Sequence, residues 1–227
     1  IAWVAIGVGA ALCLHYMTKA ADAYLLDLDV YRDAAKAAWD GDDLYALRFT
    51  DVELPYLYPP FAILFLTPLA WLSDLSAQVV WTGITLVAVI VYALICVENF
   101  AAKRFHTVTV AAVTVAFTLA MEPTESGLNF GQVNILLAMF LVLDLSHRAG
   151  RLPQGILTGI AAAVKLTPLL LVVYFLVTRR IKPALWAAGT FLACNAAAWL
   201  VFPQASWVYW TGTFLESDRV GVAYISN

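Results

Sequence analysis

Asp27 is the residue whose type and position could most directly do chemistry. It lies in Leu26-Asp27-Leu28-Asp29-Val30-Tyr31, which opens the most acidic segment of a chain that is 63% hydrophobic. A carboxyl group with an ordinary pKa of about 3.9 is ionised at neutral pH and can serve as a general base. Asp is also a preferred helix N-cap, so capping competes with catalysis here. Asp27 and Asp29 could also bind a divalent cation, although their spacing is common in solvated loops.

Other polar residues lie where a membrane-embedded reaction would need them. Lys165 interrupts an apolar segment, where an ionisable residue is costly and usually functional. It could bind a phosphate, or its ammonium could reach the membrane interface. Gln132 and Asn134 offer neutral amides for sugar hydroxyls, but amides also cap helices or bond to neighbouring helices. Arg219 could pair with a phosphate or with a nearby carboxylate in solvent.

Composition places these residues in a membrane protein. Charged residues make up 13% of the chain, against about 25% in soluble domains. The apolar runs are continuous, which predicts helices, so we expect an all-α, polytopic transmembrane helix bundle. The three cysteines are scattered and give neither a disulfide framework nor zinc spacing. The sequence contains no Gly-rich phosphate loop and no basic stripe for nucleic acid.

The two ends of the sequence indicate that it is part of a longer protein. Residue 1 is Ile and lies inside an apolar run, and the last residues lack the composition of a tail. We therefore interpret residues 1–227 as the N-terminal part of one transmembrane domain.

The elements that carry Asp27 begin with a span over residues 1–16. Residues 17–58 form a first loop that is poor in basic residues, and this favours the extracytoplasmic side. Within the loop, apolar residues from Leu28 to Trp39 recur at helical spacing, which predicts an amphipathic helix in the membrane interface. Gly41 ends that helix.

A proline-rich rim follows the amphipathic helix. Tyr58, Pro59 and Pro60 exclude a regular helix over residues 54–60, because each proline restrains the residue before it. Residues 61–72 are apolar but would extend only about 18 Å, which is short of a hydrocarbon core of about 30 Å. They form either a short span in a thinned region or a re-entrant segment.

The remaining apolar runs predict further membrane helices. Residues 79–97 form a full span, and residues 108–121 and 133–145 form a hairpin whose turn is 122–132. Residues 155–164 and 169–177 are either one kinked span or a hairpin with Lys165 at its tip, and the flanking basic residues favour the hairpin. A last span covers residues 184–201.

Taken together and in order, these motifs resemble glycosyltransferase family 87, whose members use polyprenyl-phosphate sugars. The resemblance covers nearly all of the chain from about residue 20. Any one motif is weak, but the ordered set is specific. The matching motifs are Asp27-Leu28-Asp29-Val30-Tyr31, Gly41-Asp42-Asp43-Leu44-Tyr45, Leu54-Pro55-Tyr56-Leu57-Tyr58-Pro59-Pro60-Phe61, Phe130-Gly131-Gln132-Val133-Asn134 and Lys165-Leu166-Thr167-Pro168.

The resemblance implies the architecture of C-type membrane glycosyltransferases, with an extracytoplasmic active site in a multi-pass protein of the cell membrane. Asp27 matches the family's catalytic Asp, and position 29 is variable in the family. Family members are about twice this length, so residues from the missing part would complete the site. The substrate-binding residues that we predict are Tyr31, Tyr58, Pro59, Gln132, Asn134, Lys165 and Arg219.

The expected activity is transfer of mannose from a polyprenyl-phosphate mannose donor to an envelope glycolipid or lipoglycan, in α-(1→2) linkage with inversion. No cofactor is required, although the Asp27/Asp29 pair leaves a divalent metal open. An arabinofuranosyltransferase of the same fold is a close alternative. A transporter or lipid-binding membrane subunit is an alternative from another class, because broken helices with a lysine at the break also suit transport.

Overall fold

The computed structural model describes residues 2–22, 24–100 and 107–215. Every regular element in these ranges is a helix, and Phe49 and Leu54 form an isolated bridge. The prediction of an all-α protein is therefore confirmed. The chain divides into two compact units, which are described separately. Unit 1 comprises residues 1–28 and 73–151, and unit 2 comprises residues 29–72 and 152–227, within the described ranges.

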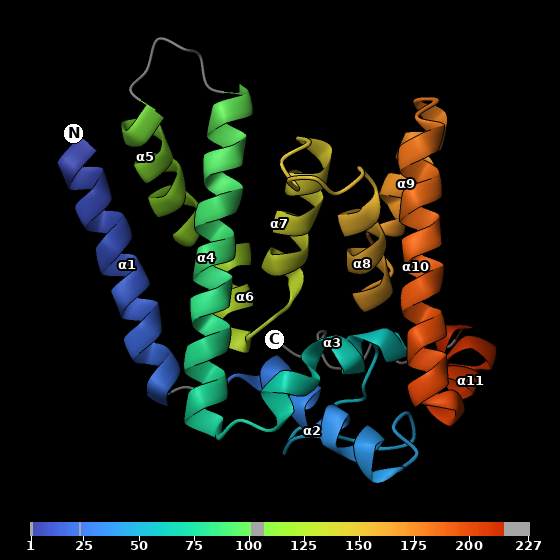
Figure 1. The fold of residues 1–227 in the computed structure, drawn as a ribbon. Coiled ribbons are helices and arrows are strands. Elements are labelled where there is room, and N and C mark those ends of the chain that lie inside the picture. The colour runs from blue at the N-terminus through green and yellow to red at the C-terminus, as the bar shows by residue number, and fades with distance from the viewer. Residues whose placement is uncertain (1, 23, 101–106, 216–227) are drawn as a thin grey trace. The chain divides into compact units, whose positions relative to one another are not determined.

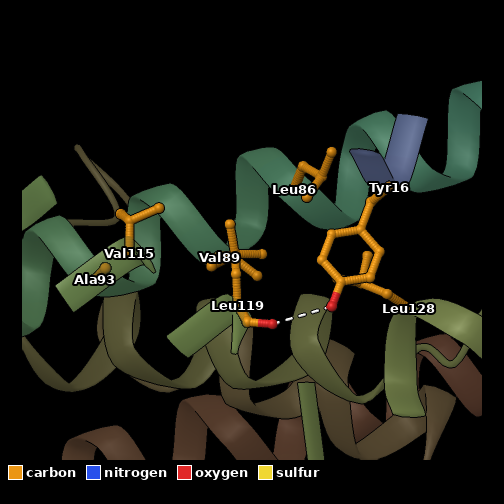
Figure 2. Close-up of a cluster of buried hydrophobic side chains, with 7 residues drawn as sticks. All are labelled: Tyr16, Leu86, Val89, Ala93, Val115, Leu119 and Leu128. Atoms are coloured by element: carbon orange, nitrogen blue, oxygen red, sulfur yellow. Dashed lines mark hydrogen bonds between the residues drawn. The ribbon is translucent and has the colours of Figure 1, made fainter. Parts of the chain in front are cut away.

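Unit 1 contains the start of α2 and five further helices (Figure 1). Its core joins α1, α4, α5 and α6 through a cluster of buried apolar side chains (Figure 2). The hydroxyl of Tyr16 donates to the carbonyl of Leu119 over 3.1 Å, so the buried phenol keeps a hydrogen bond. The helices are α1 (Ala2–Asp22), α4 (Asp74–Phe100), α5 (Thr107–Leu119), α6 (Glu122–Phe130) and α7 (Asn134–Leu145).

Two elements of unit 1 differ from the prediction. The first helix continues beyond residue 16 to Asp22, and Lys19 in its last turn donates to Asn129 Oδ1 over 2.8 Å. The predicted turn over 122–132 is largely the helix α6. Pro123 lies near its start, two glutamates in its first turn favour the helix dipole, and the left-handed Gly131 ends it. These are the ordinary start and stop signals of a short helix.

Unit 2 contains most of α2 and a group of shorter helices around α10 (Figure 1). The amphipathic helix that the sequence predicts is α2, and it ends before Gly41, whose φ is 85°. The irregular segment before α3 is also confirmed, because α3 begins at Pro60. The helices are α2 (Leu26–Asp40), α3 (Pro60–Ala70), α8 (Ile156–Val164), α9 (Leu169–Val177), α10 (Ile181–Val201), α11 (Pro203–Thr211) and the 3₁₀ turn η1 (Thr213–Leu215).

The α8–α9 pair is a hairpin and not one kinked span. A Cβ added to Gly155 would collide with Pro183, and one added to Gly159 would lie 2.5 Å from the carbonyl oxygen of Ala187. The helices α8 and α10 therefore start at the same end and run in parallel. Because α9 ends just before α10 begins, α9 runs antiparallel to α8. Lys165 then lies at the tip of the hairpin, as the flanking charges predict.

Three helices in the described residues are long and apolar enough to cross a membrane, in α1 (Trp3–Ala21), α4 (Asp74–Glu98) and α10 (Ile181–Val201). The helix α3 has only 11 residues, and Figure 1 shows it lying across the direction of α10. If α10 spans the bilayer, as its length and composition allow, α3 would lie along the membrane plane, which argues against a full crossing by residues 61–72.

Candidate functional site

The helix α2 carries Asp27 inside its first turn. Because α2 begins at Leu26, Asp27 is a helical residue and does not precede the helix as an N-cap would. A carboxylate in the first turn favours the helix dipole, so Asp27 keeps a structural role beside the predicted catalytic one. Asp27 and Tyr31 are four residues apart in one continuous helix, so they share a face. Asp27 is half-buried, whereas Tyr31 is 2% exposed.

In unit 1, the start of α2 packs on the turn that precedes the predicted amides. A Cβ on Gly131 would lie 2.9 Å from the Cβ of Leu28, which follows Asp27, and 3.2 Å from that of Leu25, two residues before Asp27. Gln132 follows Gly131 directly, and its Oε1 accepts a hydrogen bond from Asn134 Nδ2 over 2.8 Å. The fold of unit 1 thus places the segment of Asp27 against the Gly131–Gln132 turn, as expected if both serve one site.

In unit 2, three of the predicted residues are directly connected. The hydroxyls of Tyr31 and Tyr58 are 2.9 Å apart, and their rings meet edge to face. The Nζ of Lys165 lies 5.4 Å from the centroid of the Tyr58 ring, which is a cation–π distance. Lys165 is extended and ends α8, so the ammonium leaves the helix at the hairpin tip. Pro59 is buried and immediately precedes α3.

A group of tyrosines supports this arrangement, and the sequence did not reveal it. Tyr45 donates its hydroxyl to the carbonyl of Tyr58 over 3.0 Å, and the Tyr56 ring lies 6.0 Å and 5.8 Å from the rings of Tyr45 and Tyr58. Burial, followed by the nearby phenols of Tyr58 and Tyr209, raises the pKa of Tyr56 well above its ordinary value. Tyr56 is 1% exposed and packs against the rings of both Tyr45 and Tyr58.

Arg32 is a further residue that sequence reasoning missed. It is 3% exposed, and its Nε and NH2 groups donate to the carbonyls of Leu69 and Leu72 over 3.1 Å and 2.8 Å. Its NH1 lies 3.4 Å from a carboxylate oxygen of Asp29. Arg32 thus caps the C-terminal end of α3. At the N-terminal end of α3, Tyr31 is hydrogen-bonded to Tyr58, which precedes Pro59. The sequence signal that could have revealed Arg32 is its spacing of three residues from Asp29 in the amphipathic helix α2.

We expect Arg32→Met to lower the free energy of unfolding by about 2–3 kcal/mol, because it removes a buried charged donor from two carbonyls and from the partly buried Asp29 carboxylate. Thermal unfolding of the purified protein in detergent measures this change. The matched control is Lys36→Met, which removes an exposed partner of Asp33 in the same helix and should cost at most about 1 kcal/mol. Equal unfolding midpoints for the two variants would contradict a stabilising role for the hydrogen bonds of Arg32.

One predicted site residue, Arg219, lies outside the part of the chain that the structure describes. Within the described ranges, no three His, Cys, Asp or Glu side chains gather as a metal site would require.

Comparison with known proteins gives consistent matches. The model of glycosyltransferase family 87 matches residues 56–227. A polyprenol-phosphate-mannose-dependent α-(1-2)-phosphatidylinositol mannoside mannosyltransferase of Mycobacterium tuberculosis is 33% identical over 220 residues, covering 90% of this chain and 52% of that protein. The protein of the same name from Mycolicibacterium smegmatis is 34% identical over 220 residues, covering 90% and 50%.

A more distant match is an α-(1->3)-arabinofuranosyltransferase of Mycolicibacterium smegmatis, 30% identical over 190 residues, which cover 79% of this chain and 43% of that protein. No solved structure matches the chain. The chain spans about half the length of the curated relatives that it matches. Since the family model covers most of the chain, the chain belongs to glycosyltransferase family 87.

Proposed function

We propose that the protein transfers mannose from a polyprenyl-phosphate mannose donor to a phosphatidylinositol mannoside or a related envelope glycolipid. The observation that carries this proposal is the identity of 33–34% over 220 residues to two mannosyltransferases with that donor and that class of acceptor. The linkage named in those relatives, α-(1-2), is the linkage that we propose here. Family membership argues against the transporter interpretation.

The proposed step is a single displacement. An acceptor hydroxyl oxygen attacks the anomeric carbon of the mannose while the bond from that carbon to the phosphate oxygen breaks. The hydroxyl proton passes to the Asp27 carboxylate, and the bonding electron pair leaves with polyprenyl phosphate. Because the nucleophile enters opposite the leaving group, a β-linked donor gives an α-mannoside. The leaving phosphate is already anionic, so the protein must chiefly remove a proton and hold charge.

The other predicted residues take complementary roles. Lys165 would hold the donor phosphate, and the ring of Tyr58 beneath its ammonium would keep that cation in place. Tyr31 is buried and bonded to Tyr58, which supports a role beneath the site and not in direct contact with the sugar. Gln132 and Asn134, already hydrogen-bonded to each other, would bind sugar hydroxyls. Pro59 would shape the rim, and Arg219 would offer a second cation for the phosphate.

We further propose that the protein crosses the cell membrane several times and works on its extracytoplasmic face. Three apolar helices of sufficient length support the first part. The basic-poor loop over residues 17–58 supports the second, since cytoplasmic loops are richer in Lys and Arg. Lipid-linked donor and glycolipid acceptor would both reach this face from the bilayer.

The decisive experiment is a product assay on the full-length protein. Labelled polyprenyl-phosphate mannose and polyprenyl-phosphate arabinose are each offered with phosphatidylinositol mannosides, and the glycolipid products are separated and linkage-mapped. We expect label to enter the acceptor only from the mannose donor, through an α-(1→2) bond. Transfer only from the arabinose donor would support the arabinofuranosyltransferase alternative, to which the 30% identical relative points.

Lys165→Met should lower kcat/KM for the donor by about 100-fold, because the cation that stabilises the leaving phosphate is lost. KM for the acceptor should not change. The matched control is Lys182→Met, since Lys182 is exposed near the start of α10, at the end of the helix away from the hairpin tip. Steady-state kinetics with each substrate varied in turn distinguishes the two effects.

Two outcomes would refute this role for Lys165. One is a donor kcat/KM within twofold of the unsubstituted enzyme. The other is an equal loss in both lysine variants, which would indicate a general effect of charge on the membrane protein. If the full-length protein moved lipid-linked sugar across the liposome membrane and formed no glycosidic product, the proposed transferase activity would be refuted.

A further inference from the structure

The Gly131–Gln132 turn, which packs against the Asp27 segment, accepts a hydrogen bond from a buried tryptophan side chain. Trp81, in α4, is 3% exposed, and its indole Nε1–H donates to the carbonyl oxygen of Gly131 over 2.7 Å. No notable sequence pattern surrounds Trp81, and the tryptophan lies in a full-length apolar helix where packing alone would be expected. Its hydrogen bond nevertheless ends on the residue between α6 and the Gln132–Asn134 segment.

Gly131 needs this partner because of its own conformation. It is left-handed, with φ 73° and ψ 35°, and closes α6, while the N–H of Gln132 returns to the carbonyl of Gly127 over 2.8 Å. The carbonyl of a residue in this position points out of the helix and needs a donor from elsewhere. Because Gly131 is buried, a missing donor would leave an unpaired polar group in an apolar interior.

Gly131 also packs against the start of α2. Its missing side chain is what allows the contact, since an added Cβ would lie 2.9 Å from Leu28 Cβ, 3.2 Å from Leu25 Cβ and 3.4 Å from the Leu28 nitrogen. Both leucines are at most 2% exposed, so the contact is closed on all sides. The backbone of Gly131 is thus a fixed surface against which the first turn of α2 rests.

We infer that Trp81 is a positioning residue for the transfer reaction, acting through Gly131. Its single hydrogen bond fixes the turn that supports the Asp27 segment on one side and leads directly into Gln132 on the other. A displacement of the turn would move the base and the sugar-binding amide together. This inference rests on the proposed function, because it gives Asp27 and Gln132 their roles.

The test replaces Trp81 in the full-length protein by 3-benzothienylalanine, which keeps the shape of the indole but lacks the N–H, and separately makes Trp81→Phe. We expect kcat to fall about 10- to 100-fold, since small displacements of reacting groups cost this much. The number of donor-binding sites per protein should stay within twofold, and the donor KM should rise because Gln132 moves with the turn. The same replacement at Trp186, which is 50% exposed on α10, is the control and should change neither constant.

Two kinetic results would overturn the inference. One is an unchanged kcat in the 3-benzothienylalanine variant, because that replacement removes the N–H and keeps the ring, whereas Trp81→Phe also removes packing volume. The other is a fall in kcat that matches a fall in the number of donor-binding sites, which would mean only that less protein folds. Asp27→Asn is assayed alongside. If Asp27→Asn keeps full activity, the assignment of the general base has failed. If Asp27→Asn is inactive and the Trp81 variant is unchanged, only the inference about Trp81 has failed.

A second measurement does not depend on activity. With the three native cysteines replaced, Asp27→Cys carries a trifluoroethylthio label whose ¹⁹F resonance reports its surroundings. We expect one sharp resonance when Trp81 is present, and a shifted or broadened one when Trp81 is 3-benzothienylalanine. An identical resonance in both proteins would overturn the inference even if kcat had fallen.

Discussion

Asp27→Asn should reduce mannose transfer by at least about 10²- to 10⁴-fold, the usual contribution of a general base, while the protein remains folded. The amide has the size of the carboxylate but cannot accept the proton of the acceptor hydroxyl. Because Asp27 is half-buried within the first turn of α2, the substitution removes one charge without opening a cavity. Single-turnover transfer from labelled polyprenyl-phosphate mannose measures the chemical step directly.

The control for Asp27 lies in the same helix. Asp33 is exposed and pairs with Lys36 over 2.9 Å, so Asp33→Asn removes the same charge from α2 without touching the proposed site. It should transfer mannose at the rate of the unsubstituted protein. Asp29→Asn is less suitable as a control, because Asp29 is the partner of the buried Arg32. Full activity in Asp27→Asn would refute the assignment of Asp27 as the general base. Equal losses of transfer rate in Asp27→Asn and Asp33→Asn would refute it as well.

Gly159→Leu should abolish stable packing of α8 against α10 in unit 2. An added Cβ would lie 2.5 Å from the carbonyl oxygen of Ala187 and 2.6 Å from the Cβ of Thr190, and the rest of a leucine has no space. Overpacking usually costs about 1–3 kcal/mol, and a clash with backbone belongs at or above the upper end of that range. Small residues spaced four apart, here Gly155 and Gly159, allow membrane helices to approach this closely.

Gly189→Leu is the matched control, since a Cβ at Gly189 in α10 has nothing within 4 Å. The thermal unfolding midpoint in detergent should fall strongly for Gly159→Leu and stay near that of the unsubstituted protein for Gly189→Leu. Similar midpoints for both variants would contradict the close contact between α8 and α10. Because Lys165 ends α8, loss of this packing should also weaken donor binding.

Several features could be predicted from the sequence: the helical class, the amphipathic α2 with Asp27 on it, the break before Pro60 and the break at Lys165. These features follow from local rules. Periodicity places a residue on a helix face, and Pro and Gly restrict the backbone where they occur. The same rules also contained the start and stop signals of α6, which we had interpreted as a turn.

Contacts between distant residues were decided only by the tertiary structure. Trp81 and Gly131 are 50 positions apart, and Arg32 and Leu69 are 37 apart, and no local pattern pairs them. A buried indole N–H, a buried guanidinium and a glycine against a neighbouring backbone acquire their roles from the partner that the fold brings to them. For Asp27, the sequence therefore identified the carboxylate and its helix, and the fold supplied the support that gives both a fixed position.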